Sequence, residues 1–395
     1  MSVAGELAAR GHEVAWTAPH ALLPRGATVV GGCSAGVDAV DDVAGLVAAL
    51  AARPPETRAG PVEALVLWDD VLLPLAERML PAVQAAVDEF DPDALVVDQQ
   101  ALAGAAVAEG AGLPWATLVP TPAGLVDPVA DVPEVARRIR RGTRRFLRRA
   151  GLDEVTAARI DPRRSPALVV AFSTERFSGP VEAPAGRHAF VGPWSASATG
   201  PGPDREGAPS APFDWARLDP ARRLVVVAPD VPQWRRGARP LGPAADVFWS
   251  LGVQAVLVAP QERTAGHPDD VVVVPRAPLG ALARRASVVV CAGAGPAVCD
   301  LLVRGVPLVV VPSSPGQAAV AGQVVRAAAG LRVPAVRADA GSLGRAVAAV
   351  LGDARLREGA RQVGDSFAGA GGAPVAADRL EALVGVAPGS GAVLR

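Results

Sequence analysis

Few side chains in this sequence can act as acids, bases, nucleophiles or metal ligands. The 395 residues include four His and three Cys, while Lys, Tyr and Asn are absent. A Schiff-base lysine, the lysine of a phosphate-binding P-loop and a tyrosine acid are therefore excluded. Cys291 and Cys299 lie eight residues apart across a predicted strand-to-helix turn, which is more typical of small buried side chains than of metal ligands. The sequence predicts no metal site.

Asp98 is a candidate functional residue because of the place where its strand ends. It closes the apolar run ALVVD within residues 94–99. Since α/β sheets bind ligands at the carboxyl ends of their parallel strands, this carboxylate is placed for chemistry. Gly293 and Gly295 close another apolar run, and their spacing predicts a tight turn before a helix. Of the histidines, His12 is predicted to be structural and His20 to lie in a surface loop.

The elements that position these residues alternate between strands and helices. Short runs that are apolar on both faces predict buried parallel strands at residues 13–19, 94–99, 115–120, 167–173, 223–229, 254–260, 270–275, 287–293 and 307–312. Helical patterns fill residues 72–90, 101–113 and 316–331, and the last two approach a Gly at their carboxyl ends. This alternation is typical of an α/β protein with doubly wound sheets.

One segment divides the chain into two similar halves. Residues 192–212 are rich in Gly, Pro and Ser, which predicts an exposed linker. We therefore expect domains at residues 1–191 and 213–395.

Charge and composition exclude several classes of partner. Formal net charge is -1, with 39 basic against 40 acidic residues, so no overall field favours nucleic acid or anionic lipid. The sparse cysteines and the lack of a signal peptide predict a cytoplasmic location rather than export. The basic stretch at residues 137–149 predicts a solvated helix face, with contact to an anion or to the acceptor substrate as the alternative.

A longer segment resembles a known family. Residues 271–334, VVVVPRAPLGALARRASVVVCAGAGPAVCDLLVRGVPLVVVPSSPGQAAVAGQVVRAAAGLRVP, resemble without a gap the nucleotide-sugar-binding half of bacterial family 1 glycosyltransferases, which modify macrolides and other natural products. RGHEVAW at residues 10–16, the segment at 96–118 and FVGPW at 190–194 are similar to other parts of that family. The resemblance implies a GT-B fold, in which two Rossmann-type domains face a cleft and a last helix at about 374–384 crosses back to the first domain.

The resemblance also implies a set of donor-binding residues. Family members hold the donor diphosphate at a helix N-terminus, and they use a His base that an Asp orients. The matching donor positions here are Arg276, Pro278, Gly293, Gly295, Asp300 and Gln317, and Asp98 matches the orienting Asp. No cofactor is implied beyond the nucleoside diphosphate sugar as co-substrate.

Several positions depart from the family pattern. Ala292 replaces a diphosphate-binding His, Ala297 replaces a Thr, and Pro296 removes one N–H from the anion site. Residues 228–231, APDV, replace a Ser-Leu-Gly-Ser/Thr turn, and Gly316 replaces the Asp of an Asp-Gln pair.

The amino terminus departs in another way. Met1 aligns inside the family's first helix, so the first strand and the loop with the catalytic His do not precede it. Two interpretations remain: Asp98 is a relic, or the true start lies upstream and the sequence is truncated.

The expected function is transfer of a sugar, in particular a deoxysugar, from a nucleoside diphosphate donor to a hydroxyl of a hydrophobic natural product, as in antibiotic biosynthesis. The loops at residues 31–42 and 121–131 would set acceptor choice. The alternative is a degenerate GT-B protein that binds a partner or acts on the aglycone without transferring sugar. A homodimer or a complex with a partner transferase is also expected under these hypotheses. A nicotinamide-dependent oxidoreductase is disfavoured because no Gly-x-Gly-x-x-Gly follows a first strand.

Overall fold

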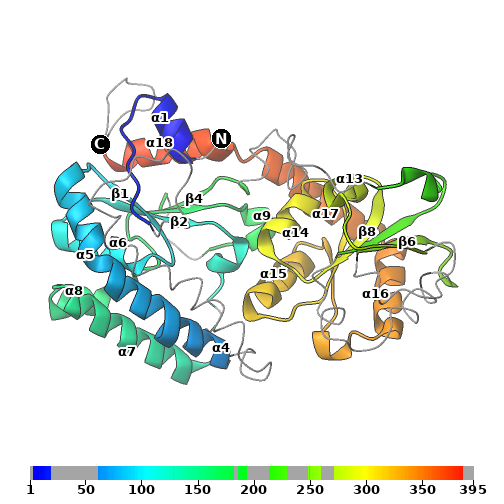
Figure 1. The fold of residues 1–395 in the computed structure, drawn as a ribbon, viewed down its shortest axis with the longest axis horizontal. Coiled ribbons are helices and arrows are strands. Elements are labelled where there is room, and N and C mark those ends of the chain that lie inside the picture. The colour runs from blue at the N-terminus through cyan, green and yellow to red at the C-terminus, as the bar shows by residue number, and fades with distance from the viewer. Residues whose placement is uncertain are drawn as a thin grey trace.

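The chain folds into two α/β lobes that lie side by side (Figure 1). The computed structural model describes residues 3–18, 61–127, 129–181, 186–193, 213–228, 248, 250–258 and 271–385. Over these ranges no helix combines the length and the apolar character needed to cross a membrane.

The amino-terminal lobe is built on a parallel sheet with the strand order β1-β2-β3-β4. The strands are β1 (Leu95–Asp98), β2 (Trp115–Val119), β3 (Leu168–Ala171) and β4 (His188–Phe190). The helical elements are α1 (Val3–Ala9), α4 (Pro61–Val66), the π-helical η4 (Leu67–Leu72), α5 (Leu73–Phe90), α6 (Leu102–Ala111), the 3₁₀ turn η5 (Pro122–Leu125), α7 (Pro133–Arg149), α8 (Glu154–Arg159) and α9 (Glu175–Ser178).

The carboxyl-terminal lobe contains a parallel sheet in the order β10-β9-β8-β5-β6-β7. Its strands are β5 (Leu224–Val227), β6 (Gln254–Val258), β7 (Val271–Val274), β8 (Ala286–Cys291), β9 (Leu308–Val310) and β10 (Gly330–Arg332). The helical elements are η6 (Trp215–Arg217), α13 (Leu279–Ala283), α14 (Gly295–Leu302), α15 (Pro315–Arg326), η8 (Ala335–Arg337), α16 (Ala340–Gly352), α17 (Ala354–Ala368) and α18 (Gly372–Leu383).

The central strand β5 shows why the sequence is apolar without alternation. Leu224 and Val226 belong to one buried cluster, whereas Val225 and Val227 belong to another on the opposite face. Successive side chains of a strand point to opposite faces, so a strand covered by helices on both faces needs an apolar residue at every position. The predicted fold class is confirmed by this architecture.

The strand predictions at residues 13–19 were wrong over the part that the structure describes. Residues 13–18 make only an isolated bridge at Trp16 instead of a ladder with a neighbouring strand. In contrast, β4 and β10 were not predicted, because each spans three residues and neither has a continuous apolar run.

The predicted carboxyl ends of two helices had different outcomes. Helix α6 ends with Gly112 in the left-handed conformation (φ 69°), as expected for a C-terminal glycine. Helix α15 ends at Arg326, and Ala328 takes the positive φ of 52°. Gly330 is required for another reason, because a side chain there would collide with the backbone of Leu308 in the adjacent strand.

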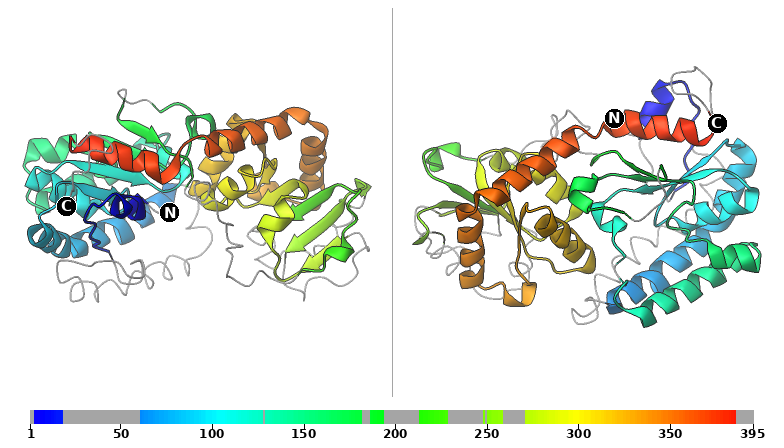
Figure 2. Two further views of the ribbon diagram at one scale, coloured as in Figure 1. Left: turned by 90° about the horizontal axis from the view of Figure 1, so that it is seen from above. Right: turned by 180° about the vertical axis from the view of Figure 1, so that it is seen from behind.

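Helix α18 leaves the carboxyl-terminal lobe and lies on the amino-terminal sheet next to α1 (Figure 2). Its Ala373, Ala376 and Leu380 share a buried cluster with Leu168 and Val170 of β3. Helix α6 packs on the other face of this sheet, where Ala105 and Ala108 meet Val97 and Trp115. The amino-terminal core is therefore completed by the last helix of the chain.

Charged side chains hold α1 against α18. The Nη1 atom of Arg10 lies 2.7 Å from Asp378 Oδ1 and 3.0 Å from Glu381 Oε2, and His12 Nε2 lies 2.9 Å from Glu381 Oε1. The Glu381 side chain is 3% exposed, whereas that of its partner Arg10 is 23% exposed, so water still weakens this ion pair. The hydrogen bond from His12, together with Arg10, lowers the pKa of Glu381 against the opposing effect of burial.

We expect Glu381→Ala to lower the free energy of unfolding by about 1 to 3 kcal/mol, since it leaves the buried His12 without this carboxylate. Asp378→Ala is the matched control, because Asp378 binds the same Arg10 but its side chain is 44% exposed, and we expect a loss below about 1 kcal/mol. Urea denaturation measures both. A carboxyl group whose pKa is lowered by folding stabilises the folded state at pH values above its pKa in the unfolded chain. The loss of unfolding free energy in Glu381→Ala is therefore largest above roughly pH 5, and it shrinks as the pH falls through the lowered pKa. Equal losses in the two variants would contradict the assignment.

Candidate functional site

The carboxyl edge of the C-terminal sheet holds the predicted donor residues. Strand order reverses between β5 and β8, and this reversal is where open α/β sheets bind ligands. The loop of Ala292, Gly293 and Ala294 leaves β8 at this point and enters α14. Arg276 and Pro278 follow β7, and Gln317 follows β9, so all these residues lie at one edge of the sheet.

Gly293 has two structural reasons to be glycine. Its φ is +99°, and a Cβ there would lie 2.7 Å from Val310 Cγ1 and 3.3 Å from the carbonyl oxygen of Gln317. The backbone of the loop therefore lies directly against β9 and the first turn of α15. A side chain at this position would be strained and would push the two loops apart.

The N-terminus of α14 presents backbone N–H groups without a side-chain cap. Ala294 is the N-cap residue, and Pro296 in the first turn contributes no N–H. Ala294, Pro296 and Ala297 are exposed. The free N–H groups and the helix dipole favour an anion here, but Ala292, at the position of the family's second His, is fully buried and offers only backbone.

The Gln317 side chain is held in place by the loop after β9. Its Oε1 accepts hydrogen bonds from the N–H of Ser313 (2.8 Å) and from Ser313 Oγ (2.9 Å), while Ser314 caps the helix. Because the amide oxygen is used within the loop, the Nε2 group remains as a hydrogen-bond donor. The adjacent Gly316 has no atom within 4 Å of a built Cβ, so space is open where the family carries a carboxylate.

The other predicted donor residues are placed less tightly. Arg276 is exposed, and Pro278 is buried as the N-cap residue of α13, which contacts both β8 and α14. The half-buried Asp300 lies in α14, and its carboxylate has no hydrogen-bond or ion-pair partner among the described residues. Neighbouring strands lie about 4.8 Å apart, and β5 and β6 stand between β8 and β7, so the loops after β7 and β8 are separated by roughly 14 Å. This separation suits an extended ligand better than a compact one.

Asp98 lies at the corresponding edge of the amino-terminal sheet. It ends β1, where it pairs in register with Leu118, and its Oδ1 accepts a 2.8 Å hydrogen bond from the N–H of Gln100. The side chain reaches solvent, yet the surrounding protein excludes part of the water around the Asp98 carboxyl. This desolvation raises its pKa against the opposing effect of that hydrogen bond. No described histidine hydrogen-bonds to Asp98.

One short segment joins the two edges. The Gln99 amide lies directly over Gly124 of η5, and at the other end of the segment a Cβ on Gly295 would lie 3.4 Å from Thr121 Cβ. Buried Gln323 of α15 donates a hydrogen bond to the carbonyl of Pro122 (2.9 Å). Gln99, which follows β1, and Gly295 at the start of α14 are distant in sequence and are thus brought to the two ends of segment 121–124.

The sequence did not predict the contribution of Ser313 and Gln323, and it predicted Thr121 only as part of an acceptor loop. The Ser-Ser pair before Pro315, with Gln four residues after Ser313, was a readable capping signal. Gln323 had no such signal, because only the packing of α15 on η5 buries it. His12 is structural, as expected, while His20, residues 229–231 and the loop at 31–42 lie outside the described residues.

Comparisons with known proteins agree with this geometry. Residues 253–383 match the family model of the erythromycin biosynthesis protein CIII-like C-terminal domain. Among solved structures, spinosyn rhamnosyltransferase SpnG is similar with a TM-score of 0.61 at 21% identity, over 96% of this chain and 94% of that chain. The calicheamicin glycosyltransferase CalG4 is similar with a TM-score of 0.61 at 22% identity, over 82% of this chain and 80% of that one. Comparison with curated protein sequences gives no match.

These matches confirm the predicted fold and the predicted resemblance. The fold is the GT-B fold of natural-product glycosyltransferases, and the C-terminal segment carries the sequence features of the CIII-like family. The resemblance to bacterial family 1 glycosyltransferases is therefore confirmed.

We expect Gly293→Ala to lower the free energy of unfolding by about 1 to 3 kcal/mol, because Ala at positive φ is strained and its Cβ meets Val310. Gly316→Ala is the matched control in the first turn of α15, and we expect no loss there because the space is open. Chemical denaturation of both variants measures this difference. Tolerance of Ala at both positions would show that the glycine loop does not pack against β9 as described.

We expect Asp98→Asn to leave stability at pH 7 unchanged or higher. A raised carboxyl pKa means that the folded state binds the proton more tightly than the unfolded chain does. The stability that protonated Asp98 contributes is therefore lost as the pH rises through its pKa in the folded state. Asn keeps the acceptor for Gln100 without the charge. Asp153→Asn is the control of opposite sign, since hydrogen bonds from Thr156 lower the pKa of Asp153, and we expect it to lose stability at pH 7. Thermal unfolding across pH 4 to 8 checks the pair, and a loss for Asp98→Asn at pH 7 would contradict the interpretation.

Proposed function

We propose that the protein transfers a sugar from a nucleoside diphosphate to a hydroxyl of a hydrophobic natural product. The observation that carries this proposal is the uncapped N-terminus of α14 at the strand reversal of a sheet whose sequence matches the CIII-like family. Backbone N–H groups and a helix dipole at that point suit a diphosphate.

The residues around the glycine loop support a particular arrangement of the donor. Pro278 and Arg276 would contact the base, where the guanidinium could stack on it, and Asp300 would bind ribose hydroxyls. Gln317 would donate from Nε2 to a sugar oxygen. The open space at Gly316, where family members have a carboxylate acceptor, favours a sugar with fewer hydroxyl donors, which is the property of a deoxysugar.

The acceptor would enter from the amino-terminal lobe. SpnG has been solved with spinosyn aglycone and with thymidine diphosphate, and VinC with DTDP. By analogy, we propose a hydrophobic aglycone beside segment 121–124 and a thymidine or related diphosphate at α14. In the transfer, the acceptor oxygen bonds to the anomeric carbon, the bond from that carbon to the diphosphate breaks, and the hydroxyl proton passes to a general base. In the family that base is a His, which the Asp at the position of Asp98 orients.

A second candidate function rests on the donor site itself. Ala292 supplies no imidazole, and Pro296 supplies no N–H, so the α14 N-terminus lacks two groups of an active family member. These features favour the degenerate alternative, a GT-B protein that binds an aglycone or a partner without a nucleotide.

Calorimetric titration with thymidine diphosphate, uridine diphosphate and their sugar conjugates separates the two. The proposal expects saturable binding, and a ligand at 100 times its Kd adds about 2.7 kcal/mol to stability.

We expect Gln317→Ala to weaken binding of the conjugate about fivefold while binding of the bare diphosphate changes little, since one hydrogen bond to the sugar is lost. Gln84→Ala, an exposed site on α5, is the control. Absence of binding by every nucleotide would overturn the proposal and leave the degenerate alternative.

A further inference from the structure

Helix α7 carries an excess of positive charge that the donor site does not use. Its 17 residues include eight arginines. Five of them pair with four carboxylates: Arg137 with Glu134, Arg138 with Asp69, Arg144 and Arg148 with Glu154, and Arg149 with Glu77. Arg140, Arg141 and Arg145 have no partner among the residues that the structure describes.

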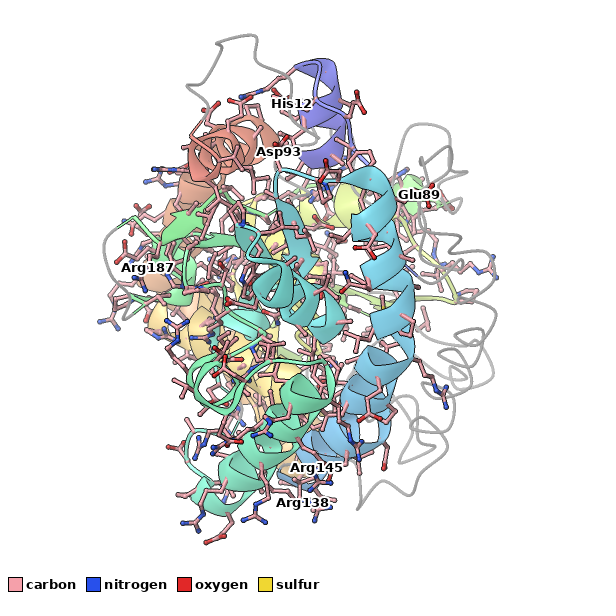
Figure 3. The ribbon with its side chains drawn as sticks, turned by 90° about the vertical axis from the view of Figure 1, so that its left-hand side faces the viewer. His12, Glu89, Asp93, Arg138, Arg145 and Arg187 are labelled. Carbon is pink, nitrogen blue, oxygen red and sulfur yellow. The ribbon has the colours of Figure 1, made fainter. Side chains whose placement is uncertain are left out.

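Part of this charge lines a groove between two helices. The groove encloses about 530 Å³ and is lined by Asp69, Leu73, Pro74, Glu77, Arg138, Arg141, Gly142, Arg145 and Arg149. The two walls run in the same direction, since Asp69 meets Arg138 (2.8 Å) and Glu77 meets Arg149 (2.6 Å). A Cβ on Gly142 would lie 2.8 Å from Leu73 Cδ1, so the helices touch at the floor. Figure 3 shows Arg138 and Arg145 on the edge of the lobe opposite to His12.

The middle of the groove is the part without anions. Arg138 and Arg149 at its ends have partners, whereas Arg141 and Arg145 between them have none. These two are four residues apart on one helix face, about 6 Å along the axis, where like charges destabilise a helix. An occupant that places carboxylates at the same spacing would remove this repulsion.

The chemistry of the surface selects one occupant. Every exposed residue of α7 is Arg, Glu or Pro, so the helix offers no apolar side chains for insertion into a lipid surface. Asp69 and Glu77 stand in the groove and would repel a continuous polyphosphate or nucleic-acid backbone. Discrete carboxylates can meet Arg141 and Arg145 while avoiding those two acids, and apolar side chains can cover Leu73 and Pro74.

We propose that the groove between α5 and α7 is a docking surface for an acidic helix of another protein. The part of α7 that lines the groove, from Arg138 to Arg149, spans about 16 Å, which is three helical turns. The helix would lie along the groove with carboxylates at i and i+4 facing Arg141 and Arg145. The proposal does not depend on the sugar-transfer reaction.

Fluorescence anisotropy of labelled peptides on the full chain tests this. The probe is an alanine-based helical peptide of about 18 residues with Glu at i and i+4 beside two Leu. A permuted peptide has the same composition with the glutamates on opposite faces. We expect Arg141→Ala/Arg145→Ala to weaken binding of the probe at least about tenfold. The matched control Arg140→Ala/Arg148→Ala removes two charges from the same helix outside the groove lining, and we expect a change within about twofold. Circular dichroism confirms that both variants fold.

Two competitors distinguish other sources of negative charge. Inorganic polyphosphate and phosphatidylserine vesicles are titrated against the wild type and both double variants. Preference for the probe over the permuted peptide, lost only in Arg141→Ala/Arg145→Ala, supports the proposal. Equal binding of the two peptides, no binding of the probe, or tighter Arg141-dependent binding of polyphosphate or vesicles would overturn it.

Discussion

The contact of η5 with α14 and α15 is the interaction on which the arrangement of the candidate site depends. Gln323 is completely buried, and its Nε2 donates to the carbonyl of Pro122 across the two lobes. Its Oε1 has no hydrogen-bond partner within the described part of the chain, which is costly for a buried amide. Such an unfavourable group is tolerated where the surrounding packing demands it. Here the packing holds Thr121 against the first residue of α14 and so brings the carboxyl edges of both sheets together.

A second connection between the lobes joins α9 to α15. Arg326 of α15 donates to the carbonyl of Ser178 (2.6 Å), and Gly179 leaves room for its guanidinium. Nearby, the N–H of Gly372 bonds to the carbonyl of Val191 where α18 crosses to the first sheet. The two lobes are therefore linked through η5, α9 and α18. Because α18 completes the amino-terminal core, the amino-terminal lobe is not built from one continuous stretch of sequence.

The absence of lysine leaves arginine as the side chain that carries permanent positive charge, and its surroundings give it different roles. Arg10, which links α1 to α18, forms ion pairs with three carboxylates. Arg285 stacks on Trp215, 4.4 Å from its ring centroid. On α7 the arginines outnumber the acids that they pair with, which leaves charge available to a partner. The same residue type thus stabilises the fold in one place and marks a surface in another.

The sequence by itself determined the buried strands, the glycine turn before α14 and the resemblance to GT-B glycosyltransferases. These properties are local: an apolar run covered on both faces, a positive φ and a contiguous motif all leave their mark within a few residues. The strand at residues 13–19 was wrong for the same reason, since apolar composition does not supply a neighbouring strand.

Only the tertiary structure decided which distant residues meet. Segment 121–124 lies between Gln99 and Gly295, and the groove joins Asp69 and Glu77 to arginines about seventy positions later. No local pattern encodes such contacts, because they follow from the packing of whole helices on sheets and of one lobe on the other. The fold was therefore readable from the chain, while the assembly of the site and the exposure of unpaired charge were not.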